Sequence, residues 1–291
     1  MKKAVSDAVT RRALLSRLVF TVPGFAYIAF FMLIPISFIV VYSFMQRGTY
    51  GGIVTNFNFE NYIRALDPLY LKVLVTSIGI ALATTVLALL IGFPAAYAIT
   101  LLPKKMQSLM LILIVLPFWT NFLIRTYAWI VLLNSEGIMN KALLGLGFIS
   151  DPLQILYTPG AVIIGLLYGY LPLMILPIYS ALERIDPTLR EAAINLGASR
   201  RASFFQITLP LSITGAMVGS IFVFVPSVGN FIVPELLGGG KTVMVGNLIR
   251  DQFLKARDWP FGSVLALVLV AMLVGLFALQ AKVGRKVTGT S

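Results

Sequence analysis

One polar stretch separates two long apolar runs of the chain, and it reads ERIDPTLREAAINLGASRRASFFQITLP from Glu183 to Pro210. Asp186 followed by proline is typical of a helix start, because aspartate accepts hydrogen bonds from free backbone amides and proline fits the first helical position. Gly197 permits the positive φ that ends such a helix. The stretch therefore predicts a helix from about Pro187 to Leu196, then a turn, then a second helix lying across the membrane surface.

The rest of the chain is strongly apolar. Of its 291 residues, 58% are hydrophobic and 12% are charged, and the mean hydropathy is +0.92. Soluble domains seldom reach such values, because they must cover a core with polar surface. Six runs can each supply the roughly 20 apolar residues that a bilayer-spanning helix requires. They cover residues 18–46, 73–103, 106–135, 152–182, 202–234 and 259–281. The only charged residue within these ranges is Arg125.

The positions of the charged residues predict how the spans are oriented. With six spans both termini lie on one side of the membrane. The tails and loops on that side carry fourteen Lys and Arg residues and four acidic residues, whereas the loops on the opposite side carry eight Lys and Arg residues and seven acidic residues. Cytoplasmic loops are enriched in Lys and Arg. We therefore expect cytoplasmic tails at 1–17 and 282–291, a six-span domain at 18–281 and a cytoplasmic loop at 183–206. Outside, the mixture of aromatic and polar residues at 56–69 predicts an interfacial helix.

Composition also excludes several kinds of chemistry. The chain contains no cysteine and no histidine, so we expect no disulfide, no metal site and no haem site. Its formal charge of +12 is spread over short loops and not gathered on one face, so a nucleic acid partner is not expected. The stretch Gly238–Thr242 reads GGGKT, but Glu235 stands where a phosphate-binding loop needs its first glycine. We expect no catalytic residue in this chain.

The polar stretch contains a spaced motif. It begins with Glu191-Ala192-Ala193, continues after three residues with Gly197, and ends after nine more with Ile207-x-Leu-Pro210. This motif resembles, without a departure, the signature loop of bacterial ABC importer permeases. The six runs and the stretch at 234–242 extend the resemblance over most of the chain, and they resemble the spermidine/putrescine class. The resemblance implies an all-α integral membrane protein with six transmembrane helices and the MetI-like architecture of type I ABC importer permeases. It assigns to ATPase coupling the residues Glu191, Ala192, Ala193, Gly197, Arg200, Ile207 and Pro210.

The resemblance also implies the partners. Two ABC ATPase subunits would bind ATP and Mg, so this chain itself would hold no cofactor. A second permease, similar but different, and a periplasmic solute-binding protein would complete the importer in the bacterial inner membrane. ATP binding would tilt the coupling helix and open the bundle outward, and hydrolysis would reset it.

Polar and aromatic residues inside the spans are candidates for a solute pathway, because an unpaired charge is costly in hydrocarbon. Prolines within the third to fifth runs favour kinked helices around such a pathway, and Pro210 is expected to break the fifth run. Arg125 would repel a polyamine and would suit an anionic or zwitterionic solute, or it has a structural role; the aromatic residues suit either a lipid-facing belt or a cation-stacking path. The candidates are Trp119, Asn121, Arg125, Tyr127, Trp129, Asn230 and Glu235.

The sequence therefore favours the permease subunit of an ATP-driven importer that carries a polyamine or a related small organic solute from periplasm to cytoplasm. One alternative is the same class of importer with an anionic or zwitterionic solute, such as an amino acid or opine derivative. Another is an ion-driven secondary transporter, which would need ionisable relays in its spans, and apart from Arg125 the runs contain none.

Overall fold

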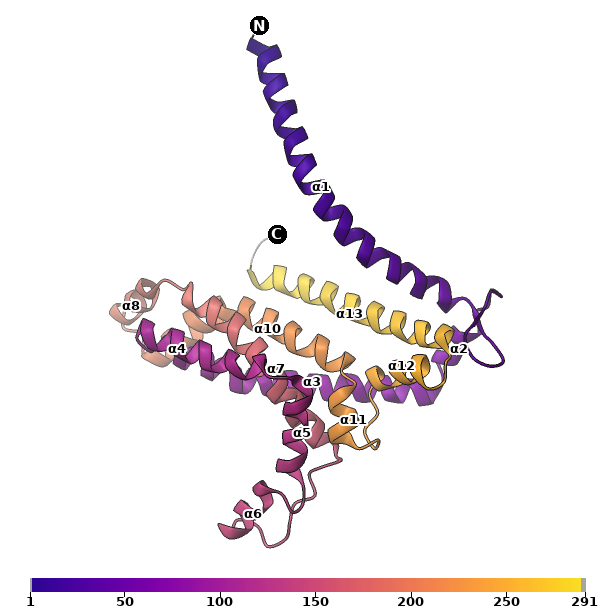
Figure 1. The fold of residues 1–291 in the computed structure, drawn as a ribbon. Coiled ribbons are helices and arrows are strands. Elements are labelled where there is room, and N and C mark those ends of the chain that lie inside the picture. Colours follow the sequence, from indigo (N-terminus) through magenta and orange to yellow (C-terminus); the bar gives the residue numbers. More distant parts are fainter. Residues whose placement is uncertain (1, 289–291) are drawn as a thin grey trace.

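The computed structural model describes the backbone of residues 2–288 and the side chains of residues 21–278, 280 and 282. Within this part the chain is almost entirely helical, with one short hairpin (Figure 1). The elements are α1 (Lys2–Ser43), β1 (Gln46–Arg47), β2 (Ile53–Val54), α2 (Glu60–Ala65), α3 (Pro68–Thr100), α4 (Lys104–Val115), the 3-10 helix η1 (Leu116–Trp119), α5 (Phe122–Leu133), α6 (Ile138–Gly145), α7 (Pro159–Glu183), α8 (Pro187–Asn195), α9 (Arg200–Ser203), the π-helical turn η2 (Phe204–Thr208), α10 (Leu209–Gly229), α11 (Ile232–Gly238), α12 (Val245–Leu254) and α13 (Trp259–Thr288).

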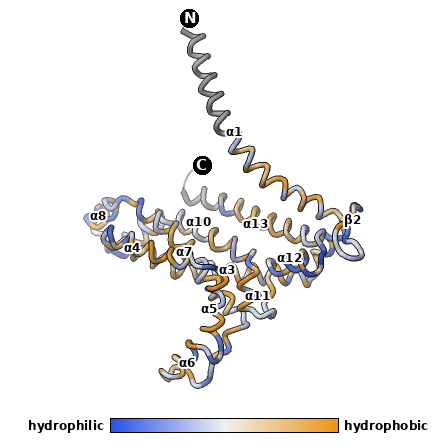
Figure 2. Tube along the Cα trace, viewed as in Figure 1, coloured by the Kyte–Doolittle hydropathy of each residue, from blue (hydrophilic) through white to orange (hydrophobic). Residues whose placement is uncertain are grey.

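Five helices in the described part of the chain are long and apolar enough to cross a membrane. They are Thr21–Ser43 within α1, all of α3, all of α7, the continuous helix Arg200–Gly229, and Trp259–Ala278 within α13. Hydrophobic residues follow these helices, whereas hydrophilic residues gather around α8 and around the hairpin (Figure 2). The prediction of an all-α protein with membrane-spanning helices is confirmed. The backbone of the predicted N-terminal tail, from residue 2 to residue 17, is the first part of the helix α1. Of the predicted C-terminal tail, residues 289–291 lie outside the described part.

The third predicted span is not one straight helix. Its two halves, Lys104–Trp119 and Phe122–Gly145, meet at 91°, and α5 and α6 project away from the direction of the other spans (Figure 1). Pro117 lies in η1, where the helix tightens and then stops, and Asn121 starts a new helix because its side-chain oxygen accepts a hydrogen bond from the Leu123 amide at 2.8 Å. A sixth span exists only if this bent pair is counted as one.

The core of the bundle is the contact between α3, α7 and α10. Met174 of α7 is fully buried, and a Cβ at Gly92 or at Gly219 would lie within 3.0 Å of its side chain. One turn further, Gly215 of α10 lies against Ala181 and against the backbone of α7 at Pro177. Small residues let membrane helices approach closely, so these glycines determine how tightly the three spans pack.

The end of the bundle opposite α8, which we call the hairpin end, is closed by loops that contact one another. The Arg64 guanidinium donates to the Asp258 carboxylate at 2.8 Å, and Arg47 donates to the Ala256 carbonyl at 2.7 Å. The helix expected over 56–69 is shorter than predicted, because Asp67 caps the next helix through the Leu69 amide and ends α2 at Ala65. The first span leaves the bundle beyond this end, and its Phe25, Phe30 and Phe38 are exposed.

Candidate functional site

The helix α8 forms where the sequence predicts it. The Asp186 side chain accepts a hydrogen bond from the Thr188 amide at 2.9 Å, and this bond holds the pKa of Asp186 below its usual value. Pro187 occupies the first helical turn, the helix ends at Asn195, and Gly197 follows with φ at +91°. The predicted helix and turn are confirmed because each depends on bonds between neighbouring residues.

The described structure leaves α8 exposed, and none of its residues is buried. Of the predicted coupling residues, Glu191, Ala192, Gly197 and Arg200 are exposed and Ala193 is half-buried. Apolar side chains lie exposed beside them, among them Leu189, Ile194 and Leu196, the last with 89% of its surface accessible. We call α8 with the turn at 196–200 the coupling surface, since it combines small, apolar and charged residues on one exposed knob.

Ile207 and Pro210 do not lie on that knob. Both belong to the start of the following span, where the chain forms the π-helical turn η2. The Leu209 amide bonds to the Phe204 carbonyl, five residues back, and Pro210 has no amide to offer Gln206. The expected break at Pro210 is wrong: the wider turn accommodates the proline ring, and the helix continues from Arg200 to Gly229.

Side chains from four elements meet beneath the coupling surface. Arg190 of α8 donates to the Tyr97 hydroxyl of α3 at 3.3 Å, and Lys104 of α4 pairs with Glu183 of α7 at 2.9 Å. They surround a hollow of about 200 Å³ whose walls also include Thr208. Sequence reasoning missed Arg190 and Tyr97, because 93 positions separate them and a tyrosine near the end of an apolar run is ordinary.

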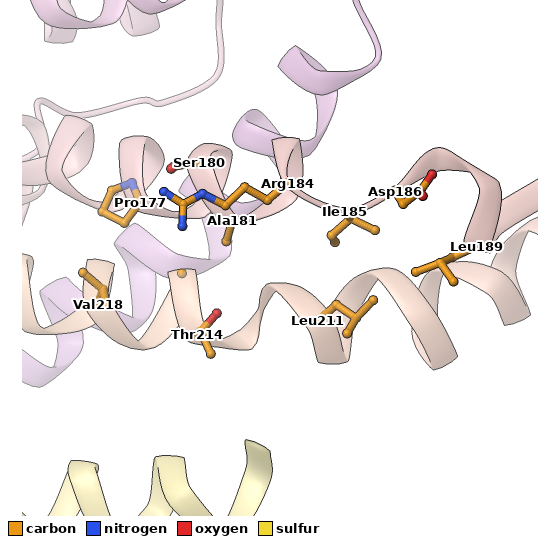
Figure 3. Close-up of a pocket in the computed structure, with 11 residues that line it drawn as sticks. Pro177, Ser180, Ala181, Arg184, Ile185, Asp186, Leu189, Leu211, Thr214 and Val218 are labelled. Carbon is orange, nitrogen blue, oxygen red and sulfur yellow. The ribbon is translucent and has the colours of Figure 1, made fainter. Parts of the chain in front are cut away.

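A wider groove of about 600 Å³ opens between the end of α7 and the start of α10. Figure 3 shows its lining: Arg184 extends along α7 toward Pro177, and Asp186 and Leu189 from the start of α8 lie at the other end. The groove therefore runs from the coupling surface into the space between two spans. Its walls carry both a cation and an anion among apolar side chains.

The predicted pathway residues of the third span are divided by the 91° bend. Trp119 lies just before the bend with 80% of its surface exposed. The side-chain oxygen of Asn121 caps α5 by accepting a hydrogen bond from the Leu123 amide. The Arg125 guanidinium carbon lies 5.3 Å from the centre of the Phe118 ring and 5.6 Å from that of Phe122. Its Nε atom is buried without a partner among the described residues.

The other pathway candidates are joined to residues outside the predicted set. Further along α5, Tyr127 is exposed, and Trp129 packs edge-on against Tyr168 at 5.4 Å between ring centres. Asn230 donates to the Tyr170 hydroxyl at 2.7 Å. This hydrogen bond joins Asn230, at the end of α10, to α7.

Glu235 belongs to a charged cluster at the edge of α12. Its carboxylate accepts from Arg250 at 3.0 Å and from Asn247 at 3.3 Å, and Arg250 also donates to Asp251 at 2.6 Å. Burial acts to raise the pKa of Asp251, but hydrogen bonds from Arg250 and Lys255 outweigh it, so the pKa is lowered. Sequence reasoning missed Arg250, because its partner Glu235 is fifteen residues away.

Comparison with known proteins follows this geometry. Residues 88–289 match the family described as the binding-protein-dependent transport system inner membrane component. The chain is 42% identical to the spermidine/putrescine transport system permease protein PotB of Escherichia coli (strain K12) over 253 residues, which cover 87% of this chain and 92% of that protein. It is 43% identical to PotB of Haemophilus influenzae over 256 residues, covering 87% and 90%.

A solved structure shares the fold. A chain in the crystal structure of a bacterial alginate ABC transporter, in complex with an alginate pentasaccharide-bound periplasmic protein, superimposes with a TM-score of 0.79 at 15% identity, covering 98% of both chains. The MetI-like membrane architecture expected from the sequence is confirmed by this likeness and by the matched family. The chain belongs to the family of multi-pass inner membrane components of binding-protein-dependent transport systems.

Proposed function

We propose that this chain is the permease subunit of an ATP-driven importer that moves a polyamine of the spermidine or putrescine kind from periplasm to cytoplasm. The observation that carries the proposal is the coupling surface: a short capped helix without a buried residue, followed by an exposed turn, that presents Leu189, Ile194 and Leu196 to solvent. Apolar side chains on an exposed knob indicate a surface that a partner covers. The PotB relatives support the choice of cargo, because identity at 42% extends over 87% of the chain.

The proposed assembly has four kinds of partner. Two ABC ATPase subunits would bind ATP and Mg and would receive the coupling surface. On this surface the small Ala192 and Ala193 follow Glu191 in α8, and Arg200 begins α9. A second, different permease chain and the lipid bilayer would cover the exposed spans, and a periplasmic solute-binding protein would deliver solute at the hairpin end. This orientation places both termini in the cytoplasm, in agreement with the excess of Lys and Arg on that side.

The position of Arg125 bears on the alternative cargo. An anionic or zwitterionic solute would suit a free guanidinium, but the Arg125 guanidinium lies within about 6 Å of the centres of both the Phe118 and the Phe122 ring, and such contacts stabilise a cation without a solute. We therefore propose a structural role for Arg125 and favour the polyamine. The exposed aromatic Trp119 is the candidate for stacking on a polyamine. The Glu235 carboxylate is paired with Arg250, so it would have to exchange this partner to attract the solute.

Reconstituted transport tests the proposal. The complete complex in proteoliposomes, with ATP inside and no ion gradient, should import labelled spermidine or putrescine delivered by the solute-binding protein, and should import glutamate poorly. Import of glutamate in preference to polyamines would instead support the anionic or zwitterionic alternative. Uptake that follows a proton or sodium gradient without ATP would contradict the importer.

A substitution at the turn after α8 tests the coupling surface itself. Alanine at Gly197 would have to adopt φ near +91°, which costs an L-residue about 1 to 2 kcal/mol. We expect Gly197→Ala to lower both ATPase association and uptake while membrane insertion is retained. Gly79→Ala is the matched control, since Gly79 has ordinary helical φ and nothing within 4 Å of its new Cβ.

A further inference from the structure

One side chain ties the coupling surface to the spans. Among the side-chain hydrogen bonds of the described residues, only the bond from the Arg190 guanidinium to the Tyr97 hydroxyl, at 3.3 Å, joins α8 to another helix. Otherwise α8 contacts α9 and η2, which follow it directly in the chain. A movement of α8 is therefore felt by α3 chiefly at Tyr97, in the last turn of that span.

Tyr97 is in turn packed against the start of the next span. Its ring lies 5.0 Å from the ring of Phe204, edge to face, and Phe93 lies 6.1 Å from the same ring. Such edge-to-face pairs have a preferred geometry and resist sliding. Tyr97 thus contacts α8 through its hydroxyl and η2, which leads into α10, through its ring.

The π-helical turn determines where Phe204 points. Phe204 is its first residue, and its carbonyl is taken by the Leu209 amide instead of the Thr208 amide. The Thr208 hydroxyl, in a residue 2% exposed, has no hydrogen-bond partner among the described residues. Thr208 lines the same hollow of about 200 Å³ as Arg190 and Tyr97. The hollow that Arg190 lines therefore contains two hydroxyl acceptors, and Arg190 uses only that of Tyr97.

We propose that Arg190, Tyr97 and Phe204 form a relay that transmits the movement of α8 to α3 and α10 together. They are positioning residues: none needs to touch the solute. When α8 tilts, Arg190 exchanges the Tyr97 hydroxyl for that of Thr208, and the freed Tyr97 releases the edge-to-face contact with Phe204. The inference rests on the proposed function, because it requires an ATPase that moves α8.

The test uses the complete importer in proteoliposomes, with Tyr97→Phe as the principal variant. It removes the hydroxyl that accepts from Arg190 and retains the ring that packs on Phe204. We measure the stimulation of ATP hydrolysis by the solute-loaded binding protein, the solute imported per ATP, and the amount of co-purified ATPase. Tyr27→Phe is the matched control, because Tyr27 is exposed within α1, sixteen residues before the end of that helix, and lies neither on the coupling surface nor at the hairpin end.

The relay predicts that Tyr97→Phe lowers the stimulation about fivefold or more, the low end of coupling between sites, while the amount of bound ATPase is unchanged. Thr208→Val should lower it as well, since it removes the second acceptor without changing side-chain volume. Arg190→Lys should retain part of the stimulation. In the double variant Arg190→Ala with Tyr97→Phe, the stimulation should fall no further than in the more impaired of the two single variants.

Two results would overturn the relay: stimulation and solute per ATP that stay at wild-type values in Tyr97→Phe, or losses that add in the double variant. A parallel loss of bound ATPase would assign Tyr97 a merely structural role and would also overturn it. Failure of the proposed function looks different, because the wild-type complex would then bind no ATPase or show no ATP-dependent uptake.

Discussion

At the scale of single residues, a close backbone approach constrains the crossing of α7 and α10. A Cβ on Gly215 would stand 2.6 Å from the Pro177 carbonyl oxygen and 3.1 Å from the Ile178 Cα. Both are backbone atoms, so neither can turn aside as a flexible side chain could.

We predict that Gly215→Ala separates α7 from α10 and destabilises the protein by about 1 to 3 kcal/mol, as overpacking of a close-packed interior does. The melting temperature in detergent measures the effect. Gly79→Ala should be neutral or slightly stabilising, because its Cβ meets nothing within 4 Å and alanine favours the helix. Equal melting temperatures for the two variants would refute the close approach at Gly215.

At the scale of elements, two prolines in the described spans act in opposite ways. Pro117 lies in η1, and the helix ends two residues later at a 91° bend. Pro210 lies just after η2, and there the helix continues. The two prolines differ in the type of helical turn around them. The π-helical turn before Pro210 is wide enough for the proline ring, whereas the 3-10 helix at Pro117 is narrower and its hydrogen bonds do not continue into α5.

We predict that Pro210→Ala removes the need for the π-helical turn and rotates Phe204 away from Tyr97, since each residue of register is about 100° of helix. The chain has no cysteine, so Tyr97→Cys with Phe204→Cys introduces a unique pair. Its disulfide yield should fall when Pro210→Ala is added. Pro226→Ala, at the far end of α10, should leave the yield unchanged, and an equal fall there would contradict the local explanation.

At the scale of the whole molecule, one ion pair joins the loops of the hairpin end. Asp258, whose side chain is 2% exposed, accepts from Arg64 of α2 and from the Phe261 amide in the first turn of α13. Burial acts to lower the pKa of Arg64, but its hydrogen bonds to Asp258 and Tyr70 outweigh it and raise the pKa. Arg64 also lies 3.9 Å above the Phe261 ring. The pair therefore fastens the loop after the first span to the last span.

We expect Asp258→Asn to cost about 1 to 3 kcal/mol, as the loss of a hydrogen bond to a charged group does. The new amide preserves the oxygen that caps α13 but no longer balances the Arg64 charge. Thermal unfolding of the purified protein measures this cost. Lys255→Gln breaks an exposed pair with Asp251 and should cost less than about 1 kcal/mol. A larger effect at Lys255 than at Asp258 would show that the hairpin end is held otherwise.

The agreement between sequence and structure is greatest where the physical cause is local. Asp186, Pro187 and Gly197 specify α8, because a cap bond spans two residues and a positive φ belongs to one. The coupling residues Glu191 to Gly197 therefore fell together on one knob. The pathway candidates have partners that the sequence did not indicate: Asn121 caps a helix, Asn230 donates to Tyr170, and Glu235 pairs with Arg250.

The sequence by itself determined that this is a helical membrane protein and where its exposed helix α8 begins and ends. Apolar length and local backbone chemistry are sufficient for both, because each acts within one segment. Only the tertiary structure decided that the third run bends by 91°, that Arg190 reaches Tyr97, and that Glu235 is paired with Arg250. These features depend on which helix faces meet in the folded chain. The paired residues are 15 to 93 positions apart, so the sequence around either residue does not indicate its partner.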